Sequence, residues 1–327
     1  MRILSGIQPS GILHIGNYLG AMRQQIALQE EHEPIYLLVD LHAITVPQDP
    51  KLLRQNTLNA AAMYLALGLD PEKAILYVQS QLSEHAELAW ILTTIASMGE
   101  LERMTQFKEK GRGEERTKVG MGLFSYPLLM AADILLYKAQ KVPIGDDQVQ
   151  HLELARDIAK RFNQRFGDTF PIPDALLAES GARIMGLDDP TVKMSKSATS
   201  AYNYIALTDD ADTVRNKIKK AVTDSGSEIT YGNDKPALKN LLTIFSGVTN
   251  EKAETITERY AGKGYADFKT DLADALIAFL SPIQERYQHL LTDEQQLVDI
   301  LHAGAERARP QAAHTLKEIK EKLGFVL

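Results

Sequence analysis

Residues 1–21 read Met1-Arg-Ile-Leu-Ser-Gly-Ile-Gln-Pro-Ser-Gly-Ile-Leu-His-Ile-Gly-Asn-Tyr-Leu-Gly-Ala21. The apolar pair Ile3-Leu4 predicts a short strand, because glycine and proline interrupt the chain soon after it. From Leu19 to Ile26, apolar residues recur at the spacing of one helix face. A polar, glycine-containing loop between a strand and a helix N-terminus predicts an anion site, since backbone N–H groups and the helix dipole favour negative charge there. The loop has neither the lysine of a P-loop nor the pattern G-x-G-x-x-G, so it must hold any phosphate by another arrangement.

Strand-like and helix-like segments alternate from this loop to about Gly186. Continuous apolar runs at 34–39, 74–78 and 141–144 predict buried parallel strands. Between them lie helical patterns, at 88–98, at 127–137 and after Asp49-Pro50, which suits an N-cap followed by proline at the first helical position. This alternation predicts an α/β fold with a Rossmann-like, doubly wound parallel sheet, whose ligands bind at the carboxyl ends of the strands.

After Ser197 the strand pattern disappears and helical patterns follow one another. Asp209-Asp210 suits a helix N-cap, apolar residues keep a helical period over 238–245 and 268–283, and a final amphipathic helix is expected from Pro310 onward. We therefore expect an α/β domain at 1–188, carrying a helical insertion, and an all-helical domain at 189–327 whose last helix can pack back on the first domain.

Composition bounds the possible functions. The chain has 327 residues, 44% of them hydrophobic, which is enough for a large core and for two domains. It has no cysteine, which fits a reducing cytoplasm, and we expect neither a signal peptide nor a membrane span, since no apolar run reaches about 18 residues. The formal net charge of −7 argues against a general nucleic-acid coat protein but is compatible with an RNA-binding enzyme.

The segment Lys193-Met-Ser-Lys-Ser197 lies at the expected domain boundary. Two lysines and two serines on one short loop suit a triphosphate, although by themselves they are a weak signal, since most loops of this kind are only solvated. The charged, glycine-rich segment 107–120 is expected to be a surface loop, which is either a solvated connector or a basic loop that meets phosphates.

Asp133 stands alone in the apolar run 128–136, three and seven residues after Met130 and Tyr126, so the three side chains share a helix face. A buried carboxylate without a donor is costly. From the residues alone, its partner is either an arginine or a helix N-terminus elsewhere in the fold, or a ligand. The histidines match no zinc pattern, so we expect no metal site and regard His85 as structural. Trp90 is expected in the core.

The loop His14-Ile-Gly-Asn17 and the Lys193–Ser197 segment together resemble the two signatures of the class I aminoacyl-tRNA synthetases. The whole chain is similar to the bacterial tryptophanyl-tRNA synthetases. The stretches that carry this similarity also include Gly6-Ile-Gln-Pro-Ser-Gly11, Asp40-Leu-His-Ala-Ile-Thr45, Glu102-Arg-Met-Thr-Gln-Phe-Lys-Glu-Lys110, Tyr126-Pro-Leu-Leu-Met-Ala-Ala-Asp-Ile-Leu135, Pro143-Ile-Gly-Asp-Asp-Gln-Val-Gln-His151 and Ala221-Val-Thr-Asp-Ser225.

The resemblance implies an ATP site and a tryptophan site. Residues expected along ATP are Gln8, Pro9, Ser10, Gly16, Asn17, Gly145, Asp146, Asp147, Ile184, Lys193, Met194, Ser195, Lys196 and Ser197, and those expected to act in catalysis are Gln8, His14, Lys193 and Lys196. The resemblance implies that Asp133 accepts the indole N–H and that Tyr126 and Gln148 hold the α-ammonium group. The expected walls of the indole pocket are Leu4, Gly6, His42, Met130, Val142 and Ile144.

The implied activity is a two-step ligase reaction with Mg²⁺ and ATP, which forms tryptophanyl-adenylate and then esterifies tRNA-Trp. The resemblance further implies a homodimer, and anticodon contacts from the helical domain, for which Arg215, Lys217, Lys219 and Lys220 are candidates against a solvated helix face. The alternatives are a tyrosyl-tRNA synthetase, a small-molecule nucleotidylyltransferase of the same superfamily, and a synthetase-like RNA-binding paralogue without catalysis.

Overall fold

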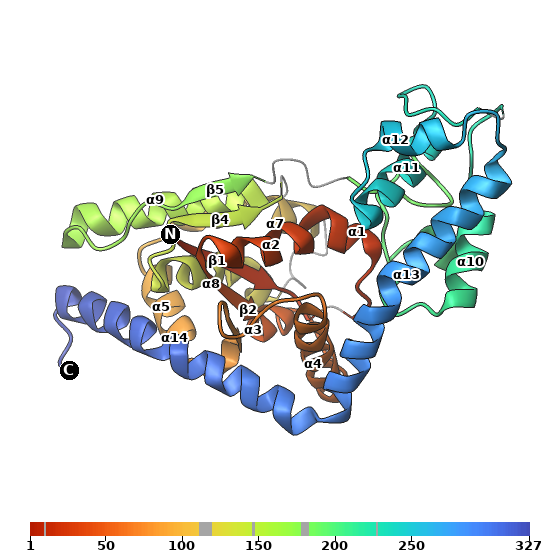
Figure 1. The fold of residues 1–327 in the computed structure, drawn as a ribbon. Coiled ribbons are helices and arrows are strands. Elements are labelled where there is room, and N and C mark those ends of the chain that lie inside the picture. The colour runs from red at the N-terminus through yellow and green to blue at the C-terminus, as the bar shows by residue number, and fades with distance from the viewer. Residues whose placement is uncertain (10, 111–119, 146–147, 178–182, 227) are drawn as a thin grey trace. The chain divides into compact units, whose positions relative to one another are not determined.

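The computed structural model describes residues 1–9, 11–110, 120–145, 148–177, 183–226 and 228–327. Packing divides the chain into two compact units, each built from separate parts of the sequence (Figure 1). The sheet unit comprises Met1–Ser10, Ala27–Ala178 and Asp293–Leu327, and the helical unit comprises Gly11–Ile26 and Glu179–Thr292. The units thus differ from the two continuous segments, 1–188 and 189–327, that the sequence predicts. Segments pack together where their apolar faces are complementary, even when they are far apart in the sequence. The order of segments along the chain therefore does not show which of them share a unit.

The sheet unit is built on five parallel strands in the order β3-β2-β1-β4-β5. Their bounds are β1 Arg2–Ile7, β2 Glu33–Leu38, β3 Ile75–Val78, β4 Lys141–Ile144 and β5 Asp174–Leu177. Ile3 in the central strand pairs with Pro34 on one side and with Lys141 on the other. The predicted doubly wound parallel sheet is confirmed, and its strand order matches the first five strands of the doubly wound order 3-2-1-4-5-6. Strand β5 is the strand of this sheet that the sequence pattern did not reveal.

Helices connect these strands and cover the sheet. Those of the sheet unit are α3 Asp40–Ala43, α4 Pro50–Ala66, α5 Glu84–Thr93, α6 Met98–Glu102, α7 Thr105–Lys110, α8 Met121–Leu136, α9 Val149–Phe166 and α14 Glu294–Leu323, with a 3-10 turn at Gln79–Gln81. The predicted cap of α4 is present, because the Asp49 side chain accepts from the Leu52 N–H at 2.9 Å. Helix α7 occupies the start of the segment expected to be a loop, and residues 111–119 lie outside the described residues.

One apolar core lies between the sheet and four helices. Leu4, Leu37, Tyr77 and Val142 face it from the strands, and they pack with buried residues of α5, α8, α9 and α14. Alternate strand residues point to the opposite face, where Tyr36 of β2 packs on Tyr64 of α4. Contrary to the sequence expectation, Trp90 is not a core residue. It lies on the outer side of α5 and is 69% exposed.

Helix α14 starts earlier than the sequence predicts. It begins at Glu294, capped by Asp293, whose side chain accepts from the Gln296 N–H at 3.0 Å. Pro310, the predicted start, lies inside the helix. Its position on the exposed face lets water satisfy the carbonyl that the missing N–H leaves free, so the helix continues through it. The same holds for Pro282, which lies exposed inside α13 (Tyr265–Thr292).

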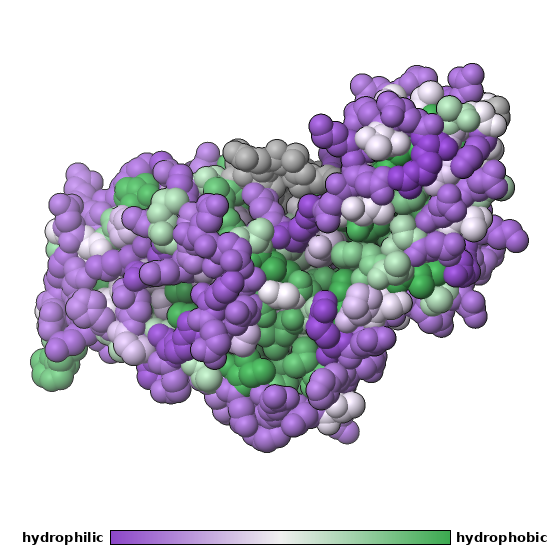
Figure 2. Space-filling model, viewed as in Figure 1, coloured by the Kyte–Doolittle hydropathy of each residue, from purple (hydrophilic) through white to green (hydrophobic). Residues whose placement is uncertain are grey.

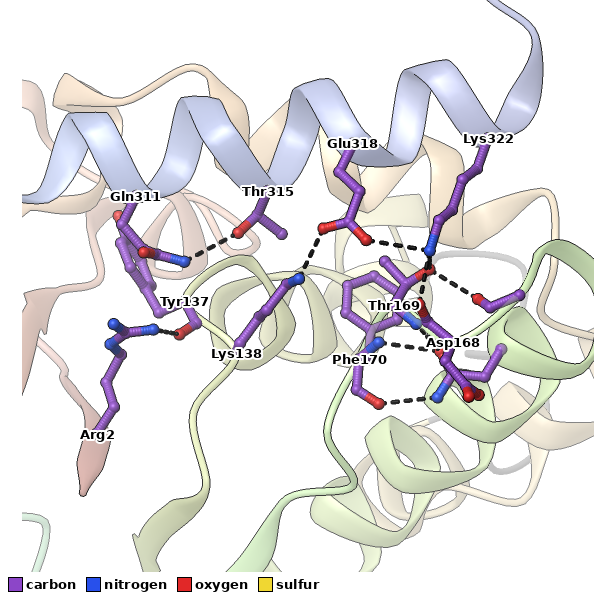
Figure 3. Close-up of polar contacts among 12 residues, drawn as sticks. Arg2, Tyr137, Lys138, Asp168, Thr169, Phe170, Gln311, Thr315, Glu318 and Lys322 are labelled. Atoms are coloured by element: carbon purple, nitrogen blue, oxygen red, sulfur yellow. Dashed lines mark hydrogen bonds and ion pairs between the residues drawn. The ribbon is translucent and has the colours of Figure 1, made fainter.

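Helix α14 is tied to the sheet unit by a row of polar contacts (Figure 3). Glu318 pairs with Lys138 at 2.7 Å and with Lys322 at 3.0 Å, and Lys322 also donates to Thr169 Oγ1 at 2.7 Å. Further along, Gly304 lets the helix backbone approach the edge strand β3 closely, which covers an edge that would otherwise expose unpaired backbone groups. The C-terminal helix is therefore part of the sheet unit.

We expect Gly304→Ala to destabilise the sheet unit by about 2–3 kcal/mol, because overpacking forces backbone shifts. A Cβ at Gly304 would lie 2.0 Å from the carbonyl oxygen of Leu76. The matched control is Gly99→Ala in α6, where the nearest atom is the end of the Arg103 side chain at 3.6 Å. Urea denaturation of both variants measures the effect. Equal free energies of unfolding for the two variants would contradict this packing.

The helical unit contains α1 Ile15–Asn17, a π-helical turn at Tyr18–Met22, and the start of α2 Arg23–Ala27. Its remaining helices are α10 Ala211–Lys220, α11 Pro236–Thr249, α12 Ala253–Arg259 and α13. The predicted cap of α10 is present, because Asp210 accepts from the Thr213 N–H at 2.7 Å. Lys217 is neither a solvated side chain nor an available anticodon contact, since it is 7% exposed and pairs with Asp209 at 2.6 Å. Within the described part of the chain, every helix is too short or too polar to cross a membrane.

Candidate active site

Asp133 lies in α8 of the sheet unit and is only 3% exposed. Three side chains donate to its carboxylate: His42 Nε2 to Oδ2 at 2.8 Å, Gln79 Nε2 to Oδ1 at 2.7 Å, and His85 Nδ1 to Oδ1 at 2.6 Å. The carboxylate only accepts, so each of these nitrogens carries the hydrogen. The buried charge therefore has partners, as its burial requires.

The donors decide the charge of this carboxyl group. Burial by itself favours the neutral form, but the hydrogen bonds from His42 and His85 outweigh burial and lower the pKa of Asp133. The group is therefore an anion at neutral pH. An ionised carboxylate offers about four lone-pair positions, of which Gln79 and His85 occupy two on Oδ1 and His42 occupies one on Oδ2. Counting the contacts of the described residues, one acceptor position is left, on Oδ2.

Sequence reasoning missed these partners. It expected an arginine, a helix N-terminus or a ligand, whereas the structure supplies two histidines and an amide. His42, expected only as a wall of the pocket, contacts the carboxylate directly. The usable signal was position, because Gln79 follows the end of β3 at the same sheet edge where polar groups were expected after each strand.

Hydrogen bonds connect His85 to two tyrosines, Tyr77 and Tyr137. Its Nε2 lies 2.7 Å from the hydroxyl of Tyr77, which in turn contacts the hydroxyl of Tyr137. All three side chains are fully buried. Burial raises the pKa of Tyr77 and of Tyr137, so both phenols stay protonated over the physiological range.

The other residues expected around the indole lie near this carboxylate or in the same core. Leu4 and Val142 are each 3% exposed, and Met130 and Ile144 pack against that core. The Tyr126 and His42 rings pack edge to face, with their centroids 6.2 Å apart. The Tyr126 hydroxyl contacts Nε2 of His151. Gly6 is the exposed residue of β1, and a Cβ there would lie 3.2 Å from the Val39 side chain.

The residues expected around ATP are divided between the units. Gln8 is exposed and Pro9 buried in the sheet unit, where the Gln148 N–H also donates to the Gly145 carbonyl at 2.9 Å at the start of α9. Ser10, Asp146 and Asp147 lie outside the described residues.

In the helical unit, His14 is the N-cap residue of α1 and its backbone N–H donates to Asn17 Oδ1 at 3.0 Å. This contact occupies the Asn17 Oδ1 acceptor and orients the amide, whose Nδ2 remains as the donor to a ligand. A Cβ at Gly16 would lie 3.0 Å from Nδ1 of His14 and 3.3 Å from Sδ of Met194. Gly16 is thus required by the packing of the His14 ring against the lysine loop.

Met194 anchors the lysine loop, residues 193–197. It is 2% exposed, and its N–H donates to the Ile184 carbonyl at 3.0 Å. The backbone N–H of Ser195 donates to Asn203 Oδ1 at 2.9 Å, and Ser197 N–H donates to Ser195 Oγ at 3.1 Å. The buried methionine leaves Lys193 and Lys196 exposed on either side of it. The serines hold the loop, as expected from the resemblance.

Both lysines act on His14. Burial, and then the positive charges of Lys193 and Lys196, lower the pKa of His14 to about 4. Partial burial also lowers the pKa of Lys196, whose ammonium lies 3.8 Å from where a Cβ of Gly11 would be. Among the described residues, the buried Nδ1 of His14 has no hydrogen-bond partner. Two cations beside a neutral imidazole form a site suited to an anion with several oxygens.

This arrangement predicts that His14 stays neutral at pH 5. Its folded pKa of about 4 lies below the ordinary 6.5, so the unfolded chain binds more protons between these values. The free energy of unfolding is therefore fully retained above the ordinary pKa and falls as the pH drops through this window. An NMR titration of the ring, assigned by loss of its signal in His14→Asn, measures the midpoint. A midpoint at the ordinary value would contradict the buried, cation-flanked placement.

The chain is similar to known proteins over its whole length. The family model "tRNA synthetases class I (W and Y)" matches residues 1–281. A tryptophan–tRNA ligase of Caldanaerobacter subterraneus subsp. tengcongensis is 54% identical over 100% of this chain and 99% of its own length, and one of Listeria monocytogenes serotype 4b is 54% identical over 99% and 97%. The crystal structure of Campylobacter jejuni tryptophanyl-tRNA synthetase complexed with ADP and tryptophan is 39% identical, with a TM-score of 0.86 over 99% of this chain and 100% of that one.

The chain therefore belongs to the class I tRNA synthetases for tryptophan and tyrosine. Within that family it stands with the tryptophan–tRNA ligases, which are enzymes. The resemblance inferred from the two signature loops is confirmed.

Proposed function

We propose that this enzyme activates L-tryptophan with ATP, releases pyrophosphate, and transfers the tryptophanyl group to the terminal adenosine of tRNA-Trp. The observation that carries this proposal is the Asp133 carboxylate, which is buried, ionised and satisfied on all but one acceptor position. Such a group matches a single donor on an apolar ring, and the indole of tryptophan has one N–H. A site built to hydrogen-bond a substrate group rejects analogues without that group by large factors.

We assign the amino-acid pocket to the sheet unit. Asp133 accepts the indole N–H beside His42, while Tyr126 and Gln148 hold the α-ammonium group. The ring is enclosed by Leu4, Gly6, His42, Met130, Val142 and Ile144. Leu4 and Val142 support this role because they are buried in the apolar core that Met130 and Ile144 join.

We assign the ATP phosphates to the lysine loop and to the loop from Gln8 to Asn17. Lys193 and Lys196 neutralise charge on the triphosphate, and His14, being neutral, donates its one N–H to a phosphate oxygen. The other residues assigned to ATP are Pro9, Ser10, Gly16, Gly145, Asp146, Asp147, Ile184, Met194, Ser195 and Ser197. The related synthetase complexed with ADP and tryptophan supports binding of an adenine nucleotide.

The chemistry needs no protein nucleophile. The tryptophan carboxylate, ionised at neutral pH, attacks the α-phosphorus, and pyrophosphate leaves with the electrons of the broken P–O bond. The two lysines and His14 stabilise the charge that develops, so catalysis is positioning and electrostatics. In the second step a ribose hydroxyl of the terminal adenosine attacks the adenylate carbonyl, releasing AMP and a proton.

Mg²⁺ is proposed to arrive with ATP. The described residues contain no group of three His, Asp or Glu side chains placed to hold a metal ion, so no protein ligands are assigned. Mg²⁺ commonly binds through substrate phosphates and water rather than through a protein cage, where it supplies positive charge.

We further propose that the protein acts in the cytoplasm as a homodimer. Large apolar side chains that remain exposed on the sheet unit support an interface, because such residues are otherwise mostly buried. Trp90 and Met98 are each 69% exposed. Figure 2 shows a mostly hydrophilic face on which apolar side chains gather in the sheet unit, beside α4. The tRNA would contact the helical unit through its exposed basic residues.

Pyrophosphate exchange into ATP, measured with each standard amino acid, tests the proposal. We expect exchange with tryptophan alone. Exchange with tyrosine alone would place the enzyme in the other branch of the family. Absence of exchange with every amino acid would support a non-catalytic RNA-binding paralogue and would contradict the proposed activity.

A further inference from the structure

A row of hydrogen bonds leads away from the proposed indole acceptor into the core. From Asp133 it passes through His85 and Tyr77 to Tyr137. The three rings pack on one another: the centroid of the His85 ring lies 6.1 Å from that of Tyr77 and 5.8 Å from that of Tyr137. None of these three residues is assigned a contact with tryptophan or ATP, and all are inaccessible to solvent.

The chemistry of these groups gives the row a direction. His85 must donate from Nδ1, because a carboxylate cannot donate. In the tautomer that carries its hydrogen on Nδ1, His85 has a lone pair on Nε2, which accepts the Tyr77 hydroxyl hydrogen, and the Tyr77 oxygen then accepts from Tyr137. Every donor thus points toward Asp133, and the hydroxyl of Tyr77 selects the His85 tautomer that serves the carboxylate.

The far end of this row is held in place by the rest of the sheet unit. The carbonyl of Tyr137 accepts from Arg2 at 2.7 Å, and the next residue, Lys138, has a left-handed φ of 50° and pairs with Glu318 of α14 (Figure 3). A non-glycine residue keeps this conformation only where its surroundings impose it. Helix α14 and strand β1 therefore hold Tyr137, the residue at the end of the row furthest from Asp133, in place.

We propose that His85, held by Tyr77 and Tyr137, is a positioning residue for amino-acid selection. It keeps the Asp133 carboxylate oriented and acceptor-only, so that the acceptor position left on Oδ2 is aimed at the indole N–H. Discrimination in favour of an N–H group thus depends on buried side chains that never touch the substrate. The inference rests on the proposed contact between Asp133 and the indole.

The test compares tryptophan with benzothienylalanine, whose ring has sulfur in place of the N–H. Tyr77→Phe keeps the ring but removes the closer partner of His85 Nε2, which is left with only the longer contact to the Tyr137 hydroxyl at 3.5 Å, so the imidazole can more readily present its unprotonated Nδ1 to the carboxylate. We expect kcat/KM for tryptophan to fall about 10-fold, in line with one lost hydrogen bond to a charged group. The value for benzothienylalanine should change little. A proton–nitrogen correlation NMR spectrum should show His85 protonated on Nδ1 in the wild type and mixed in the variant.

Tyr36→Phe is the matched control, because Tyr36 is also a fully buried tyrosine of the sheet but lies on the opposite face. It should leave the ratio of the two kcat/KM values unchanged. An equal fall for both substrates in Tyr77→Phe, or no fall, overturns the inference and leaves these residues a purely structural role. If Tyr77→Phe does not fold, Tyr137→Phe provides the same comparison one step further from the carboxylate. Asp133→Asn separates the two proposals: if that variant keeps the wild-type ratio, the indole contact itself fails.

Discussion

Replacing Lys196 by alanine is expected to slow adenylate formation by about 100-fold or more, the loss typical for one donor that stabilises a transition state. Lys196 lies on the loop anchored by Met194 and acts together with Lys193 on His14, so its charge is directed at the same place. The tryptophan dissociation constant should stay within about twofold, because an interaction made only in the transition state contributes to the rate and not to binding of the ground state. Single-turnover kinetics and calorimetric titration measure the two quantities.

Two further variants control for charge and for general surface effects. Lys196→Arg keeps the charge but changes its geometry, and should recover part of the rate. Lys252→Ala removes an exposed lysine at the start of α12 in the same unit and should leave the rate unchanged. A Lys196→Ala enzyme that loses tryptophan affinity and rate equally would contradict a role in transition-state stabilisation.

Asp133→Asn is expected to lower kcat/KM for tryptophan by about 1000-fold, because a site that recognises a polar group discriminates by factors of that order or more. Three donors already face this side chain, and an amide brings an NH₂ group of its own among them. One donor is then left facing another donor, which also costs stability. Most of the kinetic loss should appear in KM, at constant kcat, if the residue selects the amino acid.

Kinetics must be separated from unfolding in this variant. Thermal denaturation identifies the temperature range in which Asp133→Asn remains folded, and the assay is run within it. Glu318→Gln, which weakens the α14 contact with Lys138 at 2.7 Å, is a control for lost stability in the same unit. An Asp133→Asn enzyme that binds tryptophan as tightly as the wild type would remove Asp133 from the pocket.

Much of the fold could be predicted because its signals are local. Apolar runs marked four strands, and the caps at Asp49 and Asp210 depend on side chains within three residues of the backbone groups they satisfy. Strand β5 was missed because its sequence, Asp174-Ala-Leu-Leu177, has no β-branched or aromatic residue, whereas β3 and β4, which are equally short, contain such residues. The early start of α14 was missed because Pro310 resembles a helix start and only its exposed position in the fold allows it inside.

The site was predictable to a smaller extent. Its principal residues, Asp133 and the lysine loop, were found through motif and resemblance, and the spacing of Tyr126, Met130 and Asp133 correctly placed them on one helix. The donors to Asp133 could not be found in this way. His85 is 48 positions away along the chain and reaches the carboxylate only because α5 packs on α8. His14 likewise needed the fold, since its low pKa depends on burial and on lysines far along the chain.

The Asp133 carboxylate with its donors and the lysine loop have separate roles in this account: Asp133 selects the amino acid, and Lys196 stabilises the transition state of adenylate formation. The most direct test is the kcat/KM of adenylate formation for Asp133→Asn, Lys196→Ala and the double variant. Independent contributions add in free energy, so the two losses should multiply in the double variant to within about threefold. A double variant no slower than the slower single variant would show that the residues act as one unit, and would contradict this division.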